Sequence, residues 1–182
     1  GLLSIAAVLR REGFRVALLD ALARGKSRPH PPPAALDNLS AVYPEGDVSP
    51  FALFKGYRHF GYALDTVAEL AGRSGAFLVG ISSLFSTYED MALACAHAVK
   101  QRCPKALVVL GGHHPTVFPD RILDHPDIDF VLRGDGEAAL PPLAKALSRQ
   151  TDLTKVPGIA FDDPAGRRHI NPPVYVTDLN HL

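Results

Sequence analysis

Cysteine is scarce in this sequence, and so are the features of exported or membrane-bound proteins. Cys95 and Cys103 are the two cysteines in 182 residues, with seven residues between them. Two are too few for a disulfide framework, and this spacing matches neither a zinc site nor an iron–sulfur cluster. No run of about eighteen apolar residues and no basic-then-apolar leader appears in the printed sequence. We therefore expect reduced thiols, a cytoplasmic protein and no membrane partner.

An excess of charge is also missing. Lys plus Arg and Asp plus Glu number 19 each, so no overall field draws the chain to nucleic acid or an anionic membrane. With 47% hydrophobic and 21% charged residues, the composition is that of one globular domain. The chain opens with Gly1 and passes directly into a helical pattern. We expect a single domain over residues 1–182 that is a fragment, with a first strand upstream of Gly1.

Hydrophobic periodicity predicts helices that alternate with short buried strands. Helices are expected at 2–12, 51–72, 87–102, 117–124 and 137–149, and strands at 14–19, 76–82, 106–110, 130–132 and 158–161. Six prolines within 25–50 predict a long loop or insertion there. Alternation of this kind indicates right-handed crossovers, so the expected fold is doubly wound α/β with a mostly parallel, flavodoxin-like or Rossmann-like sheet.

Three loops should meet at one edge of that sheet. Each follows a predicted strand, and each is small, polar or glycine-rich: 82–87, 111–116 and 133–137. Because open α/β sheets bind ligands beyond the carboxyl ends of their strands, these loops are the candidate binding site.

Glycines and hydroxyls dominate the first two loops. Gly111 and Gly112 either form a tight turn or let a bulky ligand approach the backbone. Ser82 and Ser83 precede the next helix and are free to bind a ligand. For Ser86 and Thr87 we expect N-capping of that helix.

The remaining candidates are charged or titratable. His113 and His114 have no third ligand at metal spacing, so neutral imidazoles lining a pocket are expected rather than a metal site. Asp135 and Glu137 start a helix, where capping and ligand contact are both open. Asp20 ends a predicted strand, where a dinucleotide fold places its ribose-binding carboxylate, so a nucleotide site also stays open.

Taken together, the loops resemble a known family. Ser82-Ser83-Leu84 is similar to the Ser-x-Leu element of cobalamin-binding domains, and Gly111-Gly112 follows after 26 intervening residues, like that family's Gly-Gly element. The strings 79–84, 110–116 and 130–137 together resemble the amino-terminal domain of cobalamin-dependent radical S-adenosylmethionine enzymes. Residues 170–182 are similar to the linker that joins this domain to the radical domain.

The resemblance implies a division of labour in which cobalamin does the chemistry and this domain binds and orients it. Ser82 would bond the base of the cofactor's tail, Leu84 would pack on it, and the glycine pair would let it pass. The loops from Phe85, His113 and Asp135 would face the corrin ring. The implied cofactor-binding residues are Ser82, Ser83, Leu84, Phe85, Ser86, Gly111, Gly112, His113, His114, Pro115, Thr116, Gly134, Asp135, Gly136 and Glu137.

The implied parent is a methyltransferase, or a ring-forming enzyme resembling the anaerobic cyclase of magnesium-porphyrin synthesis. It would also carry a [4Fe-4S] cluster and S-adenosylmethionine in a downstream domain, while the fragment alone would not turn over. The Asp-x-His-xx-Gly motif that supplies a histidine to cobalt in other branches is absent from the sequence. Two alternatives remain: a non-catalytic cobalamin sensor, and a nucleotide-binding domain of a dehydrogenase or transferase.

Overall fold

The computed structural model describes residues 1–23, 27–31, 38 and 58–178. The chain divides into two compact units, one built from residues 1–19 and 64–182 and one from 20–63. The helices of the larger unit are α1 (Leu2–Arg11), α3 (Leu64–Ser74), α4 (Glu89–Arg102), α5 (His113–Val117), α6 (Pro119–Leu123) and α7 (Gly136–Arg149), with 3₁₀ turns η3 (Ser86–Tyr88) and η4 (Leu153–Lys155). Its strands are β3 (Leu78–Ser82), β4 (Leu107–Gly111), β5 (Phe130–Leu132), β6 (Ile159–Asp162) and β7 (Arg168–Ile170).

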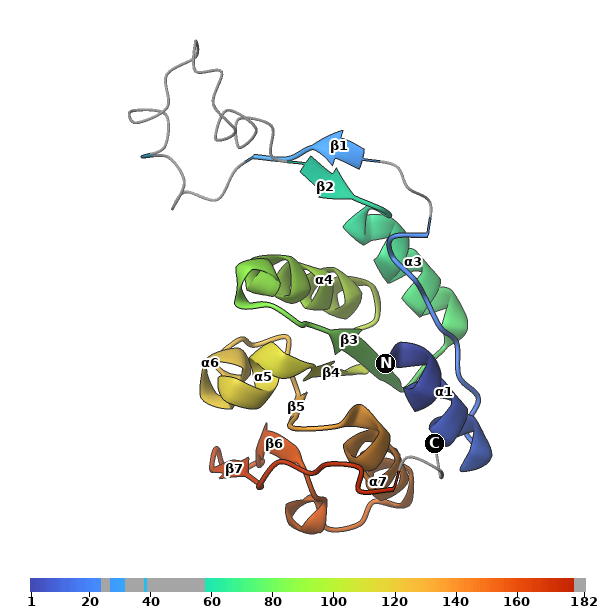
Figure 1. Ribbon diagram of the computed structural model, residues 1–182, viewed down its shortest axis with the longest axis vertical. Helices are drawn as coiled ribbons and strands as arrows, with labels where there is room; N and C mark the ends of the chain where they lie inside the picture. The colour runs from blue at the N-terminus through green and yellow to red at the C-terminus, as the bar shows by residue number, and fades with distance from the viewer. Residues whose placement is uncertain (24–26, 32–37, 39–57, 179–182) are drawn as a thin grey trace. The chain divides into compact units, whose positions relative to one another are not determined.

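These strands form one sheet in the order β3-β4-β5-β6-β7 (Figure 1). The first three are parallel, and Ser82 at the end of β3 pairs with Gly111 at the end of β4. Their carboxyl ends therefore reach the same edge. Helices cover both faces, so the doubly wound α/β prediction is confirmed for the part of the sheet that carries the candidate loops.

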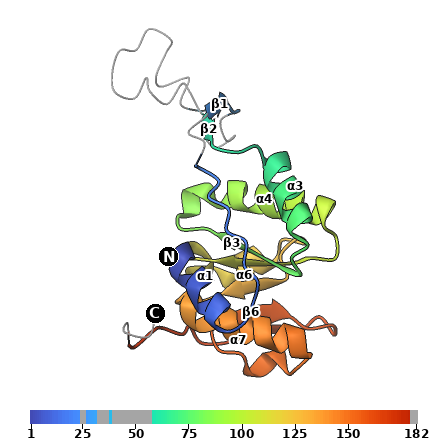
Figure 2. The ribbon, with the colours of Figure 1, turned by 90° about the vertical axis from the view of Figure 1, so that its right-hand side faces the viewer.

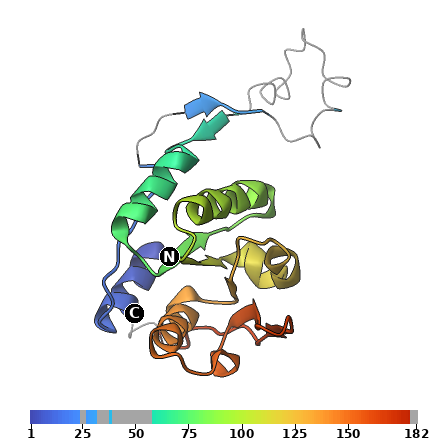
Figure 3. The same ribbon diagram turned by 180° about the vertical axis from the view of Figure 1, so that it is seen from behind.

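Each face of the sheet has its own hydrophobic core. On one face, Val108 and Leu110 of β4 pack with α4 and α6, and Val79 and Ile81 of β3 join them. On the other face, Val109 and Leu132 pack with α7, while Ile5 and Leu9 of α1 lie against that cluster. Figures 2 and 3 show α3 and α4 on one side of the sheet and α1 and α7 on the other.

The sheet is mixed, because β6 runs antiparallel to β5 and β7 runs antiparallel to β6. Helix α7 returns the chain from the carboxyl edge, and residues 150–158 then carry it back to that edge. The amide of Arg133 donates to the carbonyl of Gly158 at 2.7 Å, which fixes where β6 begins. Because residues 150–158 bring the chain back to the carboxyl edge before β6 begins, β6 runs antiparallel to β5. Strand β7 was not predicted from the sequence.

The predicted strand over 14–19 is also wrong, since residues 14–20 belong to neither a helix nor a strand. Its apolar composition suits a strand, but a strand also needs a neighbouring backbone for its amides and carbonyls. No described residue forms a ladder with this segment. The outer side of β3 likewise has no paired strand among the described residues.

The smaller unit holds a two-stranded antiparallel ribbon, β1 (Ser27–Pro29) with β2 (Arg58–Phe60). Two expectations change here: β1 lies within the predicted loop at 25–50, and β2 lies within the predicted helix at 51–72. Gly61, with φ of +87°, ends β2, and helix α3 begins only at Leu64. Most of the proline-rich stretch lies outside the described residues.

Ion pairs hold the far edge of the sheet. Arg168 of β7 donates to both carboxylate oxygens of Asp162 at 2.9 Å, and to Asp124 at 2.9 Å. These bonds raise the pKa of Arg168 and lower that of Asp162. The pKa of Asp163 is lowered chiefly by a hydrogen bond from His169. This edge is the structural end of the sheet, away from β3 and β4.

Candidate functional site

The three candidate loops are joined by hydrogen bonds at the carboxyl edge of the sheet. The amide of Ser83 donates to the carbonyl of Gly111 at 2.8 Å, which links the first loop to the second. Thr116 accepts from the amide of Gly134 at 3.0 Å, which links the second to the third. The prediction that these loops cluster is confirmed.

On the face that carries α1 and α7, this edge is lined by residues with little or no side chain. Along β3, Leu78 packs against the core, whereas Gly80 and Ser82 are exposed. Side chains alternate along a strand, so these three residues share one face. A carbon added at Gly80 would find its nearest neighbour, Val109 Cγ1, only at 3.9 Å, and one added at Gly111 would meet Leu132 Cβ at 3.4 Å. Gly80, Ser82 and Gly111 thus leave a strip of the sheet without bulky side chains, and we call this strip the slot.

Gly112 has a different role from Gly111. Its φ is +122°, a backbone conformation that side chains disfavour, and an added carbon would lie 2.3 Å from the carbonyl oxygen of Ser83. The turn that joins β4 to α5 therefore requires glycine here. Of the two readings of the glycine pair, Gly112 fits the turn and Gly111 fits the close approach.

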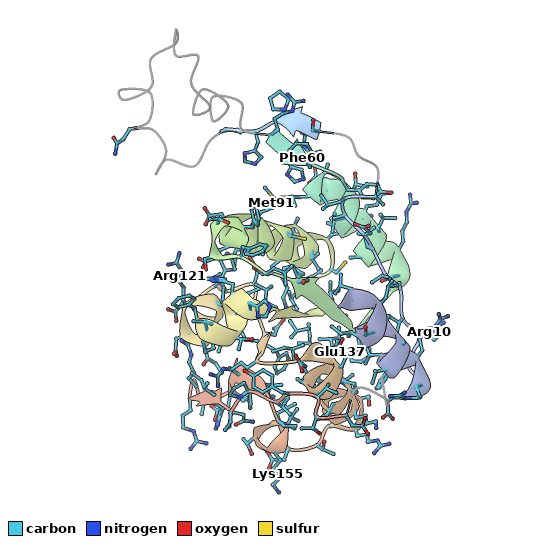
Figure 4. All side chains as sticks on the ribbon, in the orientation of Figure 1. Arg10, Phe60, Met91, Arg121, Glu137 and Lys155 are labelled. Carbon is cyan, nitrogen blue, oxygen red and sulfur yellow. The ribbon has the colours of Figure 1, made fainter. Side chains whose placement is uncertain are left out.

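A line of four polar side chains lies on the opposite face, with Glu89 and His114 buried in its middle and Arg121 exposed at one end. Arg121 Nε donates to Glu89 Oε1 at 2.8 Å, and Glu89 Oε2 lies 2.5 Å from His114 Nε2. The other ring nitrogen, His114 Nδ1, lies 2.8 Å from Ser86 Oγ. Figure 4 shows Arg121 projecting from α6 toward the side where α4 lies. The line connects the loops after β3 and β4 with α4 and α6.

Sequence reasoning assigned Ser86 and Thr87 to a helix cap, and this is wrong. Helix α4 begins after Tyr88 with no side-chain cap, and Ser86 binds the buried imidazole of His114 instead. A local capping pattern could not reveal a partner 28 residues away in sequence. Glu89 was not singled out either, although it is 6% exposed.

The third loop is tied to the C-terminal tail. The amide of Asp135 donates to the carbonyl of Val174 at 2.8 Å, and the carboxylate of Asp135 accepts from the amide of Val176 at 2.9 Å. An added carbon at Gly134 would lie 2.1 Å from the carbonyl oxygen of Val174. Asp135 stands at the N-cap position of α7 but makes no side-chain cap bond. Its carboxylate fixes the tail, so the capping alternative for Asp135 is wrong.

The two adjacent histidines lie in different surroundings. His113 is exposed, whereas His114 is 4% exposed with both ring nitrogens occupied. Among the described residues, no three His, Cys, Asp or Glu side chains are arranged to hold a metal ion. Burial raises the pKa of the Cys95 thiol, which disfavours the thiolate that metals bind.

Large apolar side chains are exposed around the same edge. Leu84 is 52% exposed, Phe85 61% and Tyr88 60%, all in the loop after β3. Tyr175, in the tail beside the third loop, is 58% exposed. Exposed apolar side chains that lie beside polar side chains at the edge of a sheet are typical of a ligand-binding or interaction surface. In the described ranges, no helix is long and apolar enough to cross a membrane.

The geometry defines a doubly wound α/β domain with a ligand edge at the carboxyl ends of β3, β4 and β5. Comparison with known proteins then gives the family. The model of the B12-binding domain matches residues 46–144. This chain belongs to the B12-binding domain family, and cobalamin is the ligand of that family. The predicted resemblance is confirmed, and the nucleotide-binding alternative is not favoured.

Relatives with known activities are larger proteins. The chain is 30% identical over 172 residues to cytidylyl-2-hydroxyethylphosphonate methyltransferase of Streptomyces wedmorensis, which covers 94% of this chain and 29% of that protein. It is 45% identical over 64 residues to the anaerobic magnesium-protoporphyrin IX monomethyl ester cyclase of a Synechocystis species, covering 35% of this chain and 13% of the cyclase. The chain thus spans less than a third of the first relative.

Solved structures share the fold. The radical S-adenosylmethionine methyltransferase TsrM from Kitasatospora setae, solved with cobalamin and a [4Fe-4S] cluster, matches with a TM-score of 0.61 and 19% identity, over 97% of this chain and 26% of TsrM. The cobalamin-dependent radical enzyme OxsB, solved with aqua-cobalamin and S-adenosylmethionine, matches with a TM-score of 0.55 and 18% identity, over 63% of this chain and 16% of OxsB.

Proposed function

We propose that this domain holds cobalamin at the carboxyl edge of β3, β4 and β5 and presents it to the catalytic domain of a radical S-adenosylmethionine enzyme. The observation that carries the proposal is the slot on the α1 and α7 face. Gly80, Ser82 and Gly111 leave a strip of sheet uncovered where every neighbouring position of β4 and β5 is packed. A flat, elongated group such as the nucleotide tail of the cofactor fits a strip of this kind.

The residues around the slot suit the parts of the cofactor. Ser82 and Leu84 are both exposed, so the hydroxyl of Ser82 would bond the tail base and Leu84 would pack on it. Phe85, His113 and Glu137 lie on the loops that would face the corrin ring. His114 and Pro115 are buried, so we assign them to the support of these loops rather than to ligand contact.

Cobalamin supplies the group-transfer chemistry, and the protein supplies position. The apolar Phe85 and Tyr88 would exclude water from one side of the ring, while the hydrogen bonds between the three loops keep the edge in one conformation. The parent enzyme would be a methyltransferase or a cyclase similar to its relatives, with a [4Fe-4S] cluster and S-adenosylmethionine in the domain that follows the linker at 170–182.

The open side of β3 supports one further part of this proposal. β3 is apolar and carries neither charge nor proline, so it has none of the features that protect a free edge. We propose that a longer form of the protein adds a parallel strand here, supplied from upstream of Gly1, and that residues 14–19 pair with its other side. This strand would complete the binding edge.

Absorption spectroscopy tests the function directly. The protein is mixed with hydroxocobalamin, passed through a desalting column, and its spectrum is recorded. We expect the cofactor to stay with the protein and its spectrum to differ from that of free hydroxocobalamin. A form extended upstream of Gly1 should retain more cofactor than the 182-residue chain. Colourless protein in both forms would contradict the proposal, and equal retention would contradict the added strand.

A further inference from the structure

The hydrogen-bonded line Ser86–His114–Glu89–Arg121, in which His114 and Glu89 are buried, fixes which of its atoms donate and which accept. The side chain of His114 is 2% exposed and that of Glu89 is 8% exposed. The His114 ring is also packed against Phe118, with ring centroids 5.3 Å apart. Neither ring nitrogen of His114 therefore depends on solvent for its partner.

The partners of His114 select one tautomer. Glu89 already accepts a hydrogen bond from the guanidinium of Arg121, and a carboxylate only accepts. His114 Nε2 must therefore carry the hydrogen that is donated to Glu89. Arg121, whose side chain is 70% exposed, gives Glu89 a cationic partner of its own, so the contact between Glu89 and His114 does not require a charged imidazole. In a neutral imidazole with Nε2–H, Nδ1 has no hydrogen and accepts.

The tautomer of His114 in turn fixes Ser86. Because Nδ1 accepts, the hydroxyl of Ser86 donates its one hydrogen to His114, and the Ser86 oxygen keeps only its lone pairs for any other group. Ser86 itself is exposed, on the loop that follows β3. This loop thus presents a hydrogen-bond acceptor that cannot turn into a donor without losing its buried partner.

Cobalamin carries primary carboxamides around its corrin ring, and these offer N–H donors. We propose that Ser86 accepts a hydrogen bond from one of these carboxamides, and that His114 is a positioning residue that holds Ser86 as an acceptor without touching the cofactor. The inference rests on the proposed function, because it takes cobalamin as the ligand. It assigns Ser86 a selective role: it favours a carboxamide over a carboxylate, which has no N–H.

The first test needs no cofactor. Nitrogen-15 NMR of the imidazole of His114 should show a hydrogen on Nε2 and none on Nδ1. His114→Ala removes the signal and identifies it. A hydrogen on Nδ1, whether in the other tautomer or in the charged ring, would overturn the proposal, because Ser86 would then be free to donate.

The second test measures binding of cobalamin against its monocarboxylates, in each of which one ring carboxamide is hydrolysed to a carboxylate. We expect one of them to bind wild type about tenfold or more weakly than cobalamin. Ser86→Ala should remove this discrimination. Thr87→Ala is the matched control, since Thr87 is the adjacent exposed hydroxyl and makes no hydrogen bond to a described residue; it should leave the discrimination unchanged.

Two replacements of His114 separate positioning from folding. In His114→Asn the amide oxygen takes the place of Nδ1 and still accepts from Ser86, so discrimination should be kept. In His114→Gln the amide takes the place of Nε2 and binds Glu89, which leaves Ser86 free to turn; discrimination should be lost while affinity for cobalamin stays within about threefold. A merely structural role would affect both variants alike.

The outcomes also separate the two proposals. If wild type does not retain cobalamin at all, the proposed function fails and the contact with Ser86 fails with it. If wild type retains cobalamin but binds every monocarboxylate equally well, or if the penalty survives in Ser86→Ala, only the role of Ser86 and His114 is overturned.

Discussion

At the carboxyl edge of β3 and β4, the two faces of the sheet differ in the size and burial of their side chains. On the α1 and α7 face, the last residues are the small Gly80, Ser82 and Gly111, of which the first two are exposed and the third is half-buried. On the α4 and α6 face, Ile81 and Leu110 are followed by a buried polar line around His114 and Glu89. The same two strands thus leave one face open and close the other.

Under the proposed function, the α1 and α7 face would bind the cofactor and the α4 and α6 face would support the loops of the edge. A strand alternates its side chains between faces, so consecutive residues of one short loop receive different tasks. The family resemblance implies that all of them contact the cofactor, whereas in the structure some are exposed, such as Ser82, and others are buried, such as His114. Substitutions on the two faces should therefore give different phenotypes.

The largest effect is expected at the turn that serves both faces. Gly112→Ala should lower the free energy of unfolding by roughly 3 kcal/mol or more, because the alanine takes a positive φ and its Cβ meets the Ser83 backbone, which cannot move aside cheaply. A urea titration followed by circular dichroism measures the loss.

Gly111→Ala is the control for that variant. Its added carbon meets the side chain of Leu132 at 3.4 Å, an ordinary contact, so the free energy of unfolding should fall by less than about 1 kcal/mol. Equal destabilisation by the two variants would show that the pair forms a single turn and that Gly111 has no separate role.

A large effect on binding alone is expected at Gly80→Val. Space around this position allows a side chain, and a β-branched residue suits a strand, so stability should be unchanged or higher by about 0.5–1 kcal/mol. The valine would occupy the slot, and cobalamin retention should fall by about 100-fold or more. Absorbance after desalting gives the retained fraction.

The matched control is Gly72→Ala, a glycine substitution on α3, where the added carbon would meet Arg102 and Cys103 at 3.4 Å. It should leave retention unchanged. If Gly80→Val keeps wild-type affinity, the tail of the cofactor does not use this face, and the comparison between the faces loses its functional meaning.

Much of the edge could be predicted from sequence because its signals are local. The strand at Phe130–Leu132 was predicted with the bounds observed, and the clustering of three loops followed from parallel strands alone. Gly80 was read only as part of a buried strand. A glycine inside a strand pattern is itself a signal for close approach of a ligand or backbone, and it could have drawn attention to the slot.

Other features depend on partners distant in the sequence. No local sequence pattern around Glu89 predicts its hydrogen bonds with His114, 25 residues later, and with Arg121. The antiparallel direction of β6 depends on how residues 150–158 return along the sheet, which periodicity does not encode. Residues 14–19 have a strand's composition but pair with no strand among the described residues, so local propensity alone predicted a strand that is not formed.

The smallest and sharpest effects are expected at two neighbouring serines that the sequence treated alike. Ser82 is exposed on the slot face, whereas Ser83 is 3% exposed, and its hydroxyl has no hydrogen-bond partner among the described residues. Ser82→Ala should weaken cobalamin binding by at most about tenfold, the value of one hydrogen bond, with no change in stability.

Ser83→Ala should affect stability rather than cobalamin binding. Removing a buried hydroxyl without a partner relieves its desolvation cost, so the free energy of unfolding should stay the same or rise by up to about 1 kcal/mol, while cobalamin affinity stays within about twofold. Urea titration and equilibrium dialysis on the same two preparations measure both quantities. Because the side chains differ by one oxygen from their replacements, neither variant should alter the backbone of β3. If Ser83→Ala weakens binding as much as Ser82→Ala, the buried hydroxyl is held for the ligand, and both faces of the edge take part in binding.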